Sequence, residues 1–217
     1  MNYQVIQQSL LGKSKLNIYK DFKKMVKRYH LIMEKDIIAV EISADKNSLT
    51  LLSCLNEFCK ENGSAFELRY FLVKEGNEIS KEMQQIIEAF EIKEYVCLEQ
   101  ENIDEVYIKM QEQGCTKVAL PNNYNDIINS TFMTLMQRKE AAQLQPKRCS
   151  NQVEKLQFIR PLCIIEDTSI IKWLEGMQIQ VVEELTLLSR LAFVEEDVVY
   201  SEYGQNAKYE FSIYERI

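Results

Sequence analysis

The sequence predicts an α/β fold in which a doubly wound, mostly parallel sheet of five strands has helices on both faces. Short apolar runs rich in Ile, Val and Phe alternate along the chain with segments of helical periodicity, and Gly or Pro punctuates several of the junctions. In addition, 46% hydrophobic residues in a chain of 217 suffice for a full core. Strands that alternate with helices pair in parallel through right-handed crossovers.

The first predicted element is a basic amphipathic helix over residues 15–29, which Ser14 caps. Its apolar face holds Ile18, Phe22, Met25 and Val26. Residues 1–35 carry eight Lys or Arg against two acids, a net charge of +6, so the remainder of the chain carries −13. Two interpretations of the lysine face stay open: a solvated surface, or a contact for an anionic partner such as tRNA.

A strand, a helix and a second strand follow. Residues 36–43 form an apolar run rich in β-branched side chains, which is typical of a buried strand. Helical spacing over residues 47–61 stops before Gly63, a residue that commonly ends a helix. Aromatic and β-branched side chains in residues 66–73 indicate the second strand.

The middle of the chain repeats this alternation. Ser80 begins a helix that reaches residue 90, because a serine hydroxyl can accept from the first free backbone N–H groups. A short third strand covers residues 95–98. The helix over residues 103–113 ends at Gly114, and the fourth strand covers residues 116–120 and ends at Pro121.

A long helix over residues 125–143 comes next, then a fifth strand over 156–161 and a helix over 166–176 that contains Trp173. The apolar residues that the long helix offers to the core are Ile127, Ile128, Met133, Leu135 and Met136. Three regions result: a helical extension (1–36), the α/β domain (37–178) and a tail (179–217).

The tail has a different pattern from the rest. Residues 178–182 favour one more strand, and residues 198–201 with 209–214 favour a hairpin. Because residues 209–214 alternate apolar and polar side chains as an edge strand does, we expect the tail to pack on the same domain or to mediate a homodimer.

Composition excludes several classes of protein. A net charge of −7 argues against non-specific nucleic-acid binding by the body of the chain. We expect a cytoplasmic protein without a membrane span, because neither a secretory leader pattern nor an apolar run of spanning length occurs. Six cysteines without a Cys-x-x-Cys, together with a single histidine, disfavour a disulfide framework and a metal site, so we interpret the cysteines as reduced packing residues.

The junction between the first strand and its helix is the most informative segment. The free N–H groups and the dipole at the start of a helix favour an anion, and many α/β proteins hold a phosphate there. Yet residues 43–48 contain no glycine and include Asp45, a carboxylate that repels phosphate. The position of a phosphate site is thus occupied by residues that discourage phosphate.

Several segments carry a resemblance to a known family. The chain resembles the PP-loop ATP pyrophosphatases, and most of all the branch that thiolates a cytidine in tRNA. Residues 119–130 stand where that branch has its Ala-Leu-Gly-His-His/Asn-x-Asp-Asp-x-x-Glu-Thr signature. The other matching segments are Leu-Leu-Gly-Lys at 10–13, the helix at 18–32, Ile-Ile-Ala-Val at 37–40, Ser-x-x-Lys-x-Ser-Leu-Thr-Leu-Leu at 43–52, Pro-Lys at 146–147 and Ile-Arg-Pro-Leu at 159–162.

The resemblance implies a nucleotide-binding loop with altered chemistry. Members of the family carry Ser-Gly-Gly-x-Asp-Ser, which holds the pyrophosphate of ATP; the matching residues are Ser43, Ala44, Asp45, Lys46, Asn47 and Ser48. Ala44 is strained at the positive φ that a glycine allows. The carboxylate of Asp45 would repel a phosphate charge about 4 Å away. The repulsion energy is roughly 1 kcal/mol in water and about 4 kcal/mol at an effective dielectric constant near 20. Asn47 removes a carboxylate ligand for Mg²⁺.

The second signature is altered as well. Its matching polar residues are Asn122, Asn123, Asn125 and Asp126, of which only Asp126 can ionise. Pro121 lacks the N–H of the family's glycine, and Glu41 adds a negative charge on the strand that leads to the loop. Lys147 and Arg160, beside the prolines of the later motifs, are candidate anion contacts.

The resemblance also implies an iron–sulfur cluster, but the cysteines of this chain do not have the pattern by which the family binds one. The thiolating branch holds it with a Cys-x-x-Cys inserted before the fourth strand, and the segment from Cys97 to Cys115 has neither the length nor the spacing. The residues offer no catalytic nucleophile, since Ser43 and Ser48 have no histidine partner. The single histidine, His30, stands at a helix end, where a capping or packing role is favoured.

Two functions therefore compete. The first is a degenerate PP-loop protein without ATP pyrophosphatase or sulfur-transfer activity, which acts as a binding or interaction protein. The second is a weak enzyme, related to tRNA modification, that binds ATP or AMP through the retained Ser43, Lys46 and Ser48 and adenylates its substrate.

Overall fold

A computed structural model of the chain describes residues 3, 5, 18–63, 65–74, 79–99, 103–138, 145–149 and 156–179. The elements are α2 (Ile18–Tyr29), β1 (Ile37–Glu41), α3 (Lys46–Glu61), β2 (Glu67–Lys74), α4 (Lys81–Ala89), β3 (Val96–Glu99), α5 (Ile103–Glu112), β4 (Lys117–Ala119), α6 (Tyr124–Arg138), β5 (Lys147–Cys149), β6 (Gln157–Ile159) and α7 (Asp167–Glu175). No helix among these described residues is long and apolar enough to cross a membrane.

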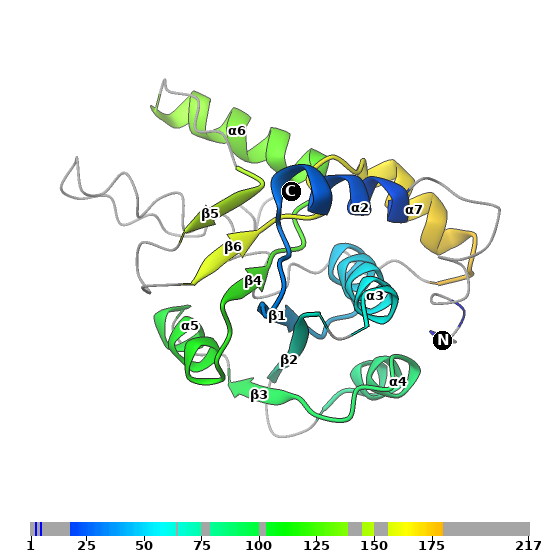
Figure 1. Ribbon diagram of the computed structural model, residues 1–217. Helices are drawn as coiled ribbons and strands as arrows, with labels where there is room; N and C mark the ends of the chain where they lie inside the picture. Colours follow the sequence, from blue (N-terminus) through cyan, green and yellow to red (C-terminus); the bar gives the residue numbers. More distant parts are fainter. Residues whose placement is uncertain are drawn as a thin grey trace.

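The sheet has the strand order β3-β2-β1-β4-β6-β5 (Figure 1). All neighbours pair in parallel except β5, which runs antiparallel to β6. The chain builds β1, β2 and β3 outward in one direction and then returns to the other side of β1 with β4. The point between β1 and β4 is therefore a topological switch point, where the loops after the two strands diverge and open α/β sheets bind their ligands.

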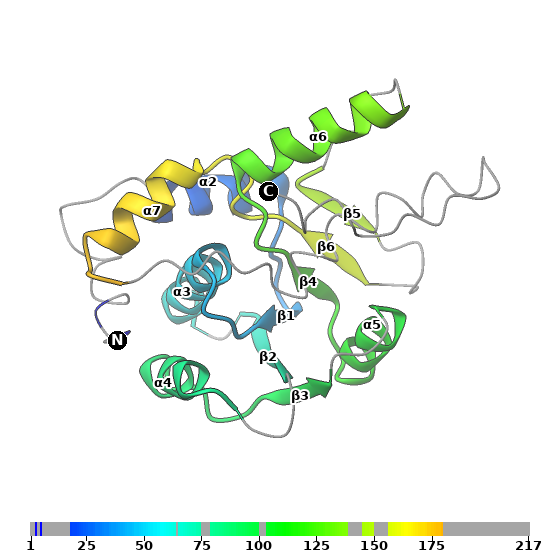
Figure 2. The ribbon, with the colours of Figure 1, turned by 180° about the vertical axis from the view of Figure 1, so that it is seen from behind.

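Helices cover both faces of the sheet, as the sequence predicts. Figures 1 and 2 show α5 on one face and α3 with α4 on the other. Successive side chains of a strand alternate between these layers. In β1, Ile38 and Val40 pack in the cluster with α3 and α4, whereas Ala39 packs with Tyr107 and Met110 of α5.

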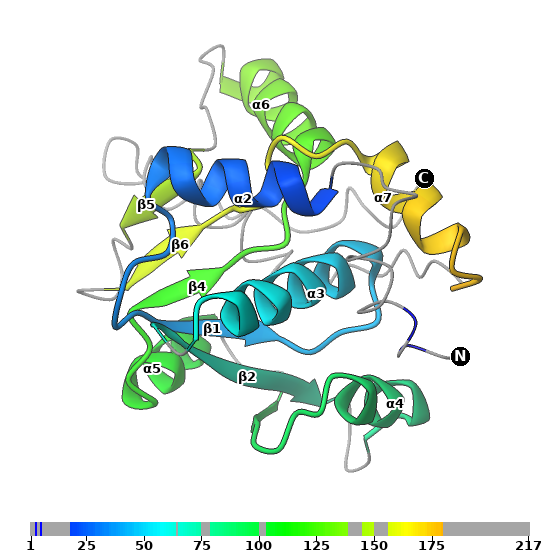
Figure 3. The ribbon, with the colours of Figure 1, turned by 45° about the vertical axis from the view of Figure 1, so that its right-hand side comes forward.

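Helix α2 packs against α3 on the same side of the sheet (Figure 3), and its apolar residues Phe22, Met25 and Val26 are part of the main core. It ends in a Schellman motif: His30 adopts a positive φ of 49°, and the Leu31 N–H donates to the Val26 carbonyl at 3.0 Å. His30 thus ends the helix, the role that its position favours. The lysines at positions 20, 24 and 27 are exposed, so an anionic partner for this face stays a prediction.

Three expectations need correction. The sheet has six strands and not five, because the antiparallel edge strand β5 carries no apolar pattern in the sequence. Ile128 is exposed instead of buried, whereas its neighbour Ile127 packs against the core. Cys97 and Cys149 are exposed and so are not packing residues, although Cys54, Cys115 and Cys163 are buried.

Other predictions lie outside the described residues. These are the Ser14 cap, the motif at residues 10–13, the end of the long helix beyond residue 138, and the tail from residue 180 with its hairpin. Residue 178, where a further strand was expected to begin, lies in the turn after α7.

Candidate functional site

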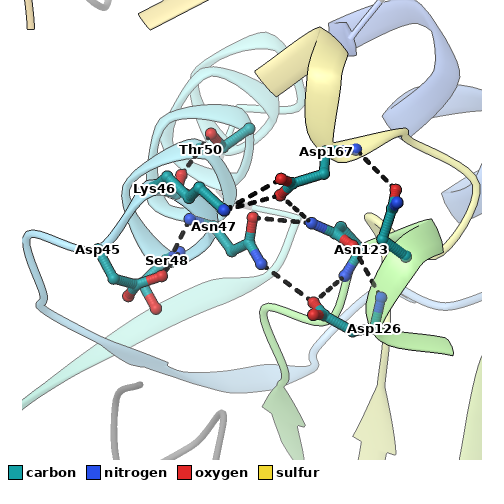
Figure 4. A network of polar contacts seen from close by, with 9 residues as sticks. Asp45, Lys46, Asn47, Ser48, Thr50, Asn123, Asp126 and Asp167 are labelled. Atoms are coloured by element: carbon teal, nitrogen blue, oxygen red, sulfur yellow. Dashed lines mark hydrogen bonds and ion pairs between the residues drawn. The ribbon is translucent and has the colours of Figure 1, made fainter. Parts of the chain in front are cut away.

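The loop between β1 and α3 ends in a cap made by the side chain of Asp45. Its Oδ1 accepts hydrogen bonds from the N–H groups of Asn47 (2.9 Å) and Ser48 (3.1 Å), and its carbonyl accepts from Leu49. These N–H groups belong to the second and third residues of α3, the donors that a helix leaves free. The carboxylate of Asp45 therefore occupies the donors that a bound phosphate would use (Figure 4).

Asp45 is buried, with 5% of its surface exposed. Burial raises the pKa of its carboxyl group, and the hydrogen bonds from Ser48, Asn47 and Ser43 oppose that rise. The loop also avoids the strain expected for Ala44. Asp45 has an extended backbone (φ −65°, ψ 152°), and Ala44 is not among the residues with positive φ. The loop thus folds without the left-handed backbone that a glycine pair allows.

The second motif forms the start of α6. Asn123 and Asp126 make a reciprocal cap: the Asn123 N–H donates to Asp126 Oδ2 at 2.9 Å, and the Asp126 N–H donates to Asn123 Oδ1 at 3.0 Å. This is the geometry of a capping box, in which each side chain satisfies the backbone of the other residue. Here the motif residues hold the helix end.

Side chains link this cap to the first loop. Asn47 Nδ2 donates to Asp126 Oδ2 at 3.0 Å, and Asn123 Nδ2 donates to Asn47 Oδ1 at 3.1 Å. The structure therefore joins the two motifs, which stand more than seventy residues apart, at the carboxyl ends of β1 and β4. Their polar atoms are engaged mainly with one another (Figure 4).

A third segment completes the network, and the sequence analysis missed it. Asp167, the first residue of α7, accepts from Lys46 Nζ (3.0 Å to Oδ1) and from Asn123 Nδ2 (2.9 Å). Its own N–H donates to Asn125 Oδ1 at 3.0 Å. The signal available was an acid in the first turn of a predicted helix, which is too common to indicate a site.

Asp126 is the titratable group at the centre of the network. Burial, reinforced by the charges of Asp167 and Asp45, raises its pKa to about 6, while the Asn123 N–H and the charge of Lys46 act in the opposite direction. An aspartate with this pKa changes its charge just below neutral pH, so the network carries a pH-sensitive carboxyl group.

The remaining candidates lie elsewhere or are buried. Lys147 Nζ is 3.5 Å from the His30 carbonyl at the end of α2. Arg160 is fully buried, and its Nη1 donates to the Gln145 carbonyl at 2.9 Å. Glu41 is buried at the end of β1. Asn122 is buried too, and its Oδ1 has no hydrogen-bond partner among the described residues.

The cysteines do not converge. All six are free thiols, and burial raises the pKa of Cys115 to about 12 and that of Cys163 to about 11, with Arg69 and Arg160 opposing the respective shifts. Within the described part of the chain, no three His, Cys, Asp or Glu side chains are grouped so that they could hold a metal ion.

Sequence comparison finds similarity to tRNA-cytidine(32) 2-sulfurtransferases. The protein of that name from Legionella pneumophila (strain Paris) is 23% identical over 171 residues, covering 68% of this chain and 60% of the relative. The one from Coxiella burnetii is 24% identical over 174 residues, covering 70% and 68%. This chain thus spans about 60% of the length of the Legionella relative. No family model matches the sequence.

Structure comparison agrees on the fold. The U34-tRNA thiolase NcsA from Methanococcus maripaludis, solved with its 4Fe-4S cluster, superposes with a TM-score of 0.57 at 18% identity. The match covers 86% of this chain and 73% of the thiolase. These findings confirm the predicted resemblance to the PP-loop family and the α/β fold that it implies.

Proposed function

From the kinship of this chain with PP-loop tRNA-thiolating enzymes, we propose that it is a family member without ATP pyrophosphatase or sulfur-transfer activity, which serves as a binding protein. The observation that carries the proposal is the position of the Asp45 carboxylate at the start of α3. Its carboxylate accepts from the Asn47 and Ser48 N–H groups at 2.9 and 3.1 Å, where a phosphate would otherwise bind.

The energetic argument is one of competing anions. A phosphate charge about 4 Å from this carboxylate costs about 4 kcal/mol at an effective dielectric near 20. That energy corresponds to nearly a thousandfold loss of affinity. If the phosphate displaced the side chain instead, α3 would lose its cap, at a cost of about 1 kcal/mol. Either route disfavours a bound triphosphate.

The metal chemistry of the family is affected too. By the resemblance, an aspartate stands at position 47 in active members, opposite the carboxylate of residue 126, and such a pair favours Mg²⁺. Here Asn47 Nδ2 donates to Asp126 Oδ2 at 3.0 Å. An amide donor thus takes the place of the cation. Lys46, the retained cation of the loop, pairs with Asp167 at 3.0 Å.

Calorimetric titration with ATP and AMP, with and without Mg²⁺, tests this proposal. We expect no binding by the natural chain up to about 1 mM, a concentration that corresponds to about 4 kcal/mol of affinity. The variant with Ala44→Gly, Asp45→Gly and Asn47→Asp together should bind ATP in the presence of Mg²⁺. Ser80→Gly, which removes the matching cap of α4, is the control and should not bind. Micromolar binding of ATP by the natural chain contradicts the proposal.

The second candidate is an enzyme that binds ATP or AMP and adenylates its substrate with ATP, which releases pyrophosphate. It is favoured by Ser43, Lys46 and Ser48, which the loop retains, and by the position of the start of α3 at a topological switch point of the sheet. Release of pyrophosphate from ATP in the presence of tRNA distinguishes the two functions. Release that depends on Lys46 supports the enzyme, and its absence together with the absence of ATP binding supports the binding protein.

A further inference from the structure

Strand β2 has a neighbour on both sides over only part of its length. Its residues 71–74 pair with β3, whereas residues 67–70 precede the start of β3 and pair with β1 alone. Because β3 is the outermost strand (Figure 1), residues 67–70 form a short free edge among the described residues, which we call the β2 edge. A free edge presents unpaired backbone groups, to which another extended segment can add.

The backbone N–H groups that point outward from the β2 edge are those of Leu68 and Tyr70. Consecutive residues of a parallel strand direct their backbone groups toward opposite neighbours. The Glu67 N–H donates to the Asp36 carbonyl at 2.8 Å, so Glu67 and every second residue after it face β1. The N–H groups of Leu68 and Tyr70 therefore face the side on which β3 has not yet begun.

A pocket of about 490 Å³ adjoins the β2 edge, between β2 and the connection from α4 to β3. This volume is within the usual range of ligand sites. Because side chains alternate along a strand, the two sides of the pocket differ. On the side of α3 and α4 its lining is aliphatic or aromatic: Leu68, Tyr70, Ile92 and Tyr95. On the side of α5 its lining is polar, with Arg69 and Gln113.

Arg69 has a donor that no described residue uses. Its Nη2 lies 3.4 Å from Glu67 Oε2 in an exposed pair, but its Nε is buried and has no hydrogen-bond partner in the described part of the chain. A buried donor without an acceptor is unfavourable, and a carboxylate is a strong acceptor for a guanidinium group. The other charges around the pocket, Lys93 with Glu91 and Glu94, are of both signs. The position of Arg69 therefore favours an acid on the α5 side.

These features define the segment that fits. A residue placed opposite Arg69 points to the same face as Arg69, and its two neighbours point to the face with the aliphatic and aromatic lining. The fitting pattern is an acid between two large apolar or aromatic residues. Among the residues outside the described ranges, this pattern occurs once, at Tyr209-Glu210-Phe211.

We propose that residues 209–211 add to the β2 edge of their own molecule, with Glu210 beside Arg69 and with Tyr209 and Phe211 against the aliphatic and aromatic side of the pocket. The chain is long enough for this. Thirty positions separate Ile179, the last described residue, from Tyr209. An extended segment of that length spans up to about 100 Å, whereas a domain of this size is about 45 Å across.

This inference goes beyond the proposed function, because it concerns another part of the sheet. The β2 edge precedes the start of β3, at the amino end of β2, whereas the polar network lies at the carboxyl ends of β1 and β4. Its test involves no nucleotide, so the two proposals can fail separately.

Hydrogen exchange of the full chain, measured by NMR at the amides of Leu68 and Tyr70, tests the proposal. Both N–H groups exchange slowly if a strand covers them and fast if water does. We expect slow exchange in the natural chain and exchange about tenfold faster or more in Glu210→Arg. Glu202→Arg makes the same change of charge outside the pattern, so it is the matched control and should leave the exchange slow.

A charge swap separates the loss of one contact from a general effect of either substitution. Arg69→Glu combined with Glu210→Arg should restore slow exchange. If Arg69→Glu does not fold, as judged by circular dichroism, Tyr209→Ser with Phe211→Ser takes its place and should speed the exchange.

The concentration dependence identifies the molecule that supplies the segment. Exchange that does not change with protein concentration supports pairing within one molecule. Exchange that slows as the concentration rises indicates the segment of a second copy and overturns the proposal. Fast exchange at Leu68 and Tyr70 in the natural chain, or slow exchange that Glu210→Arg leaves unchanged, overturns it too.

Discussion

Asn47 and Asp126 stand 79 positions apart in the chain, yet a hydrogen bond of 3.0 Å joins Asn47 Nδ2 to Asp126 Oδ2. The same Asp126 oxygen accepts from the Asn123 N–H at 2.9 Å. Two donors therefore converge on one carboxylate oxygen at the carboxyl ends of β1 and β4. These hydrogen bonds favour the charged form of Asp126 and partly offset the burial that raises its pKa, so the identity of residue 47 affects the electrostatics of the site.

Asn47→Asp should make the fold dependent on Mg²⁺. The substitution removes a donor and places a second carboxylate beside Asp126, so we expect a loss of about 1–3 kcal/mol in the free energy of unfolding at neutral pH. A divalent cation between the two carboxylates should restore part of that stability. Urea unfolding in EDTA and in Mg²⁺ measures the effect, with the natural chain as the control that Mg²⁺ leaves unchanged. Equal stability of the variant in both solutions contradicts this interpretation.

Asp45→Ala should destabilise the chain by about 1 kcal/mol, because the second and third N–H groups of α3 lose their acceptor. Asp45→Asn keeps the accepting oxygen and should retain most of the stability. Urea unfolding of both variants checks this expectation. Ser80→Ala, which removes the acceptor of the Met83 N–H at the start of α4, calibrates the loss of an ordinary cap. The cap has no energetic role if Asp45→Ala is as stable as the natural chain.

Asp126 should make stability fall as the pH rises. Its pKa in the folded chain is about 6, above the ordinary value of 3.8, so the folded state binds this proton more tightly than the unfolded state does. Stability is therefore lost between about pH 4 and about pH 6, by on the order of 3 kcal/mol, and the loss persists above that window.

Asp126→Asn should abolish this part of the pH dependence, because its Oδ1 can still accept from Asn47 and Asn123 but no proton is exchanged. The measurement is the free energy of unfolding of both proteins from pH 4 to pH 7. The stability of the variant relative to the natural chain should rise across that interval. A constant difference would show that Asp126 titrates alike in both states.

Lys46 and Asp167 should be energetically coupled. Their side chains are only 17% and 23% exposed, and Nζ lies 3.0 Å from Oδ1. A double-mutant cycle with Lys46→Met and Asp167→Asn should give a coupling free energy of about 1–2 kcal/mol, because partial burial reduces solvent screening. The control cycle uses Lys23 and Glu61, a pair at 3.3 Å with 41% and 38% exposure, for which we expect less than about 1 kcal/mol. Equal coupling in both cycles contradicts a structural role for the network.

Particular residues show which parts of the fold could be predicted from the sequence and which could not. The apolar run that became β1 can be recognised in the sequence because a strand buried on both faces carries apolar side chains along most of its length. Lys147–Cys149 has no such pattern, and it forms β5 only because β6 offers it an edge. Helix α6 has apolar residues on more than one side, so its spacing alone does not tell that Ile127 faces the core and Ile128 faces solvent.

By itself, the sequence determined the α/β fold, the resemblance to the PP-loop family and the motif residues at the two helix starts, since local periodicity and short motifs encode these features. The tertiary structure decided what those residues do. In the folded chain the Asp45 carboxylate accepts hydrogen bonds from backbone N–H groups at the start of α3, and Asp167 contacts Lys46 and Asn123. Contacts between segments so distant in the chain depend on the order of the strands, which no local pattern specifies.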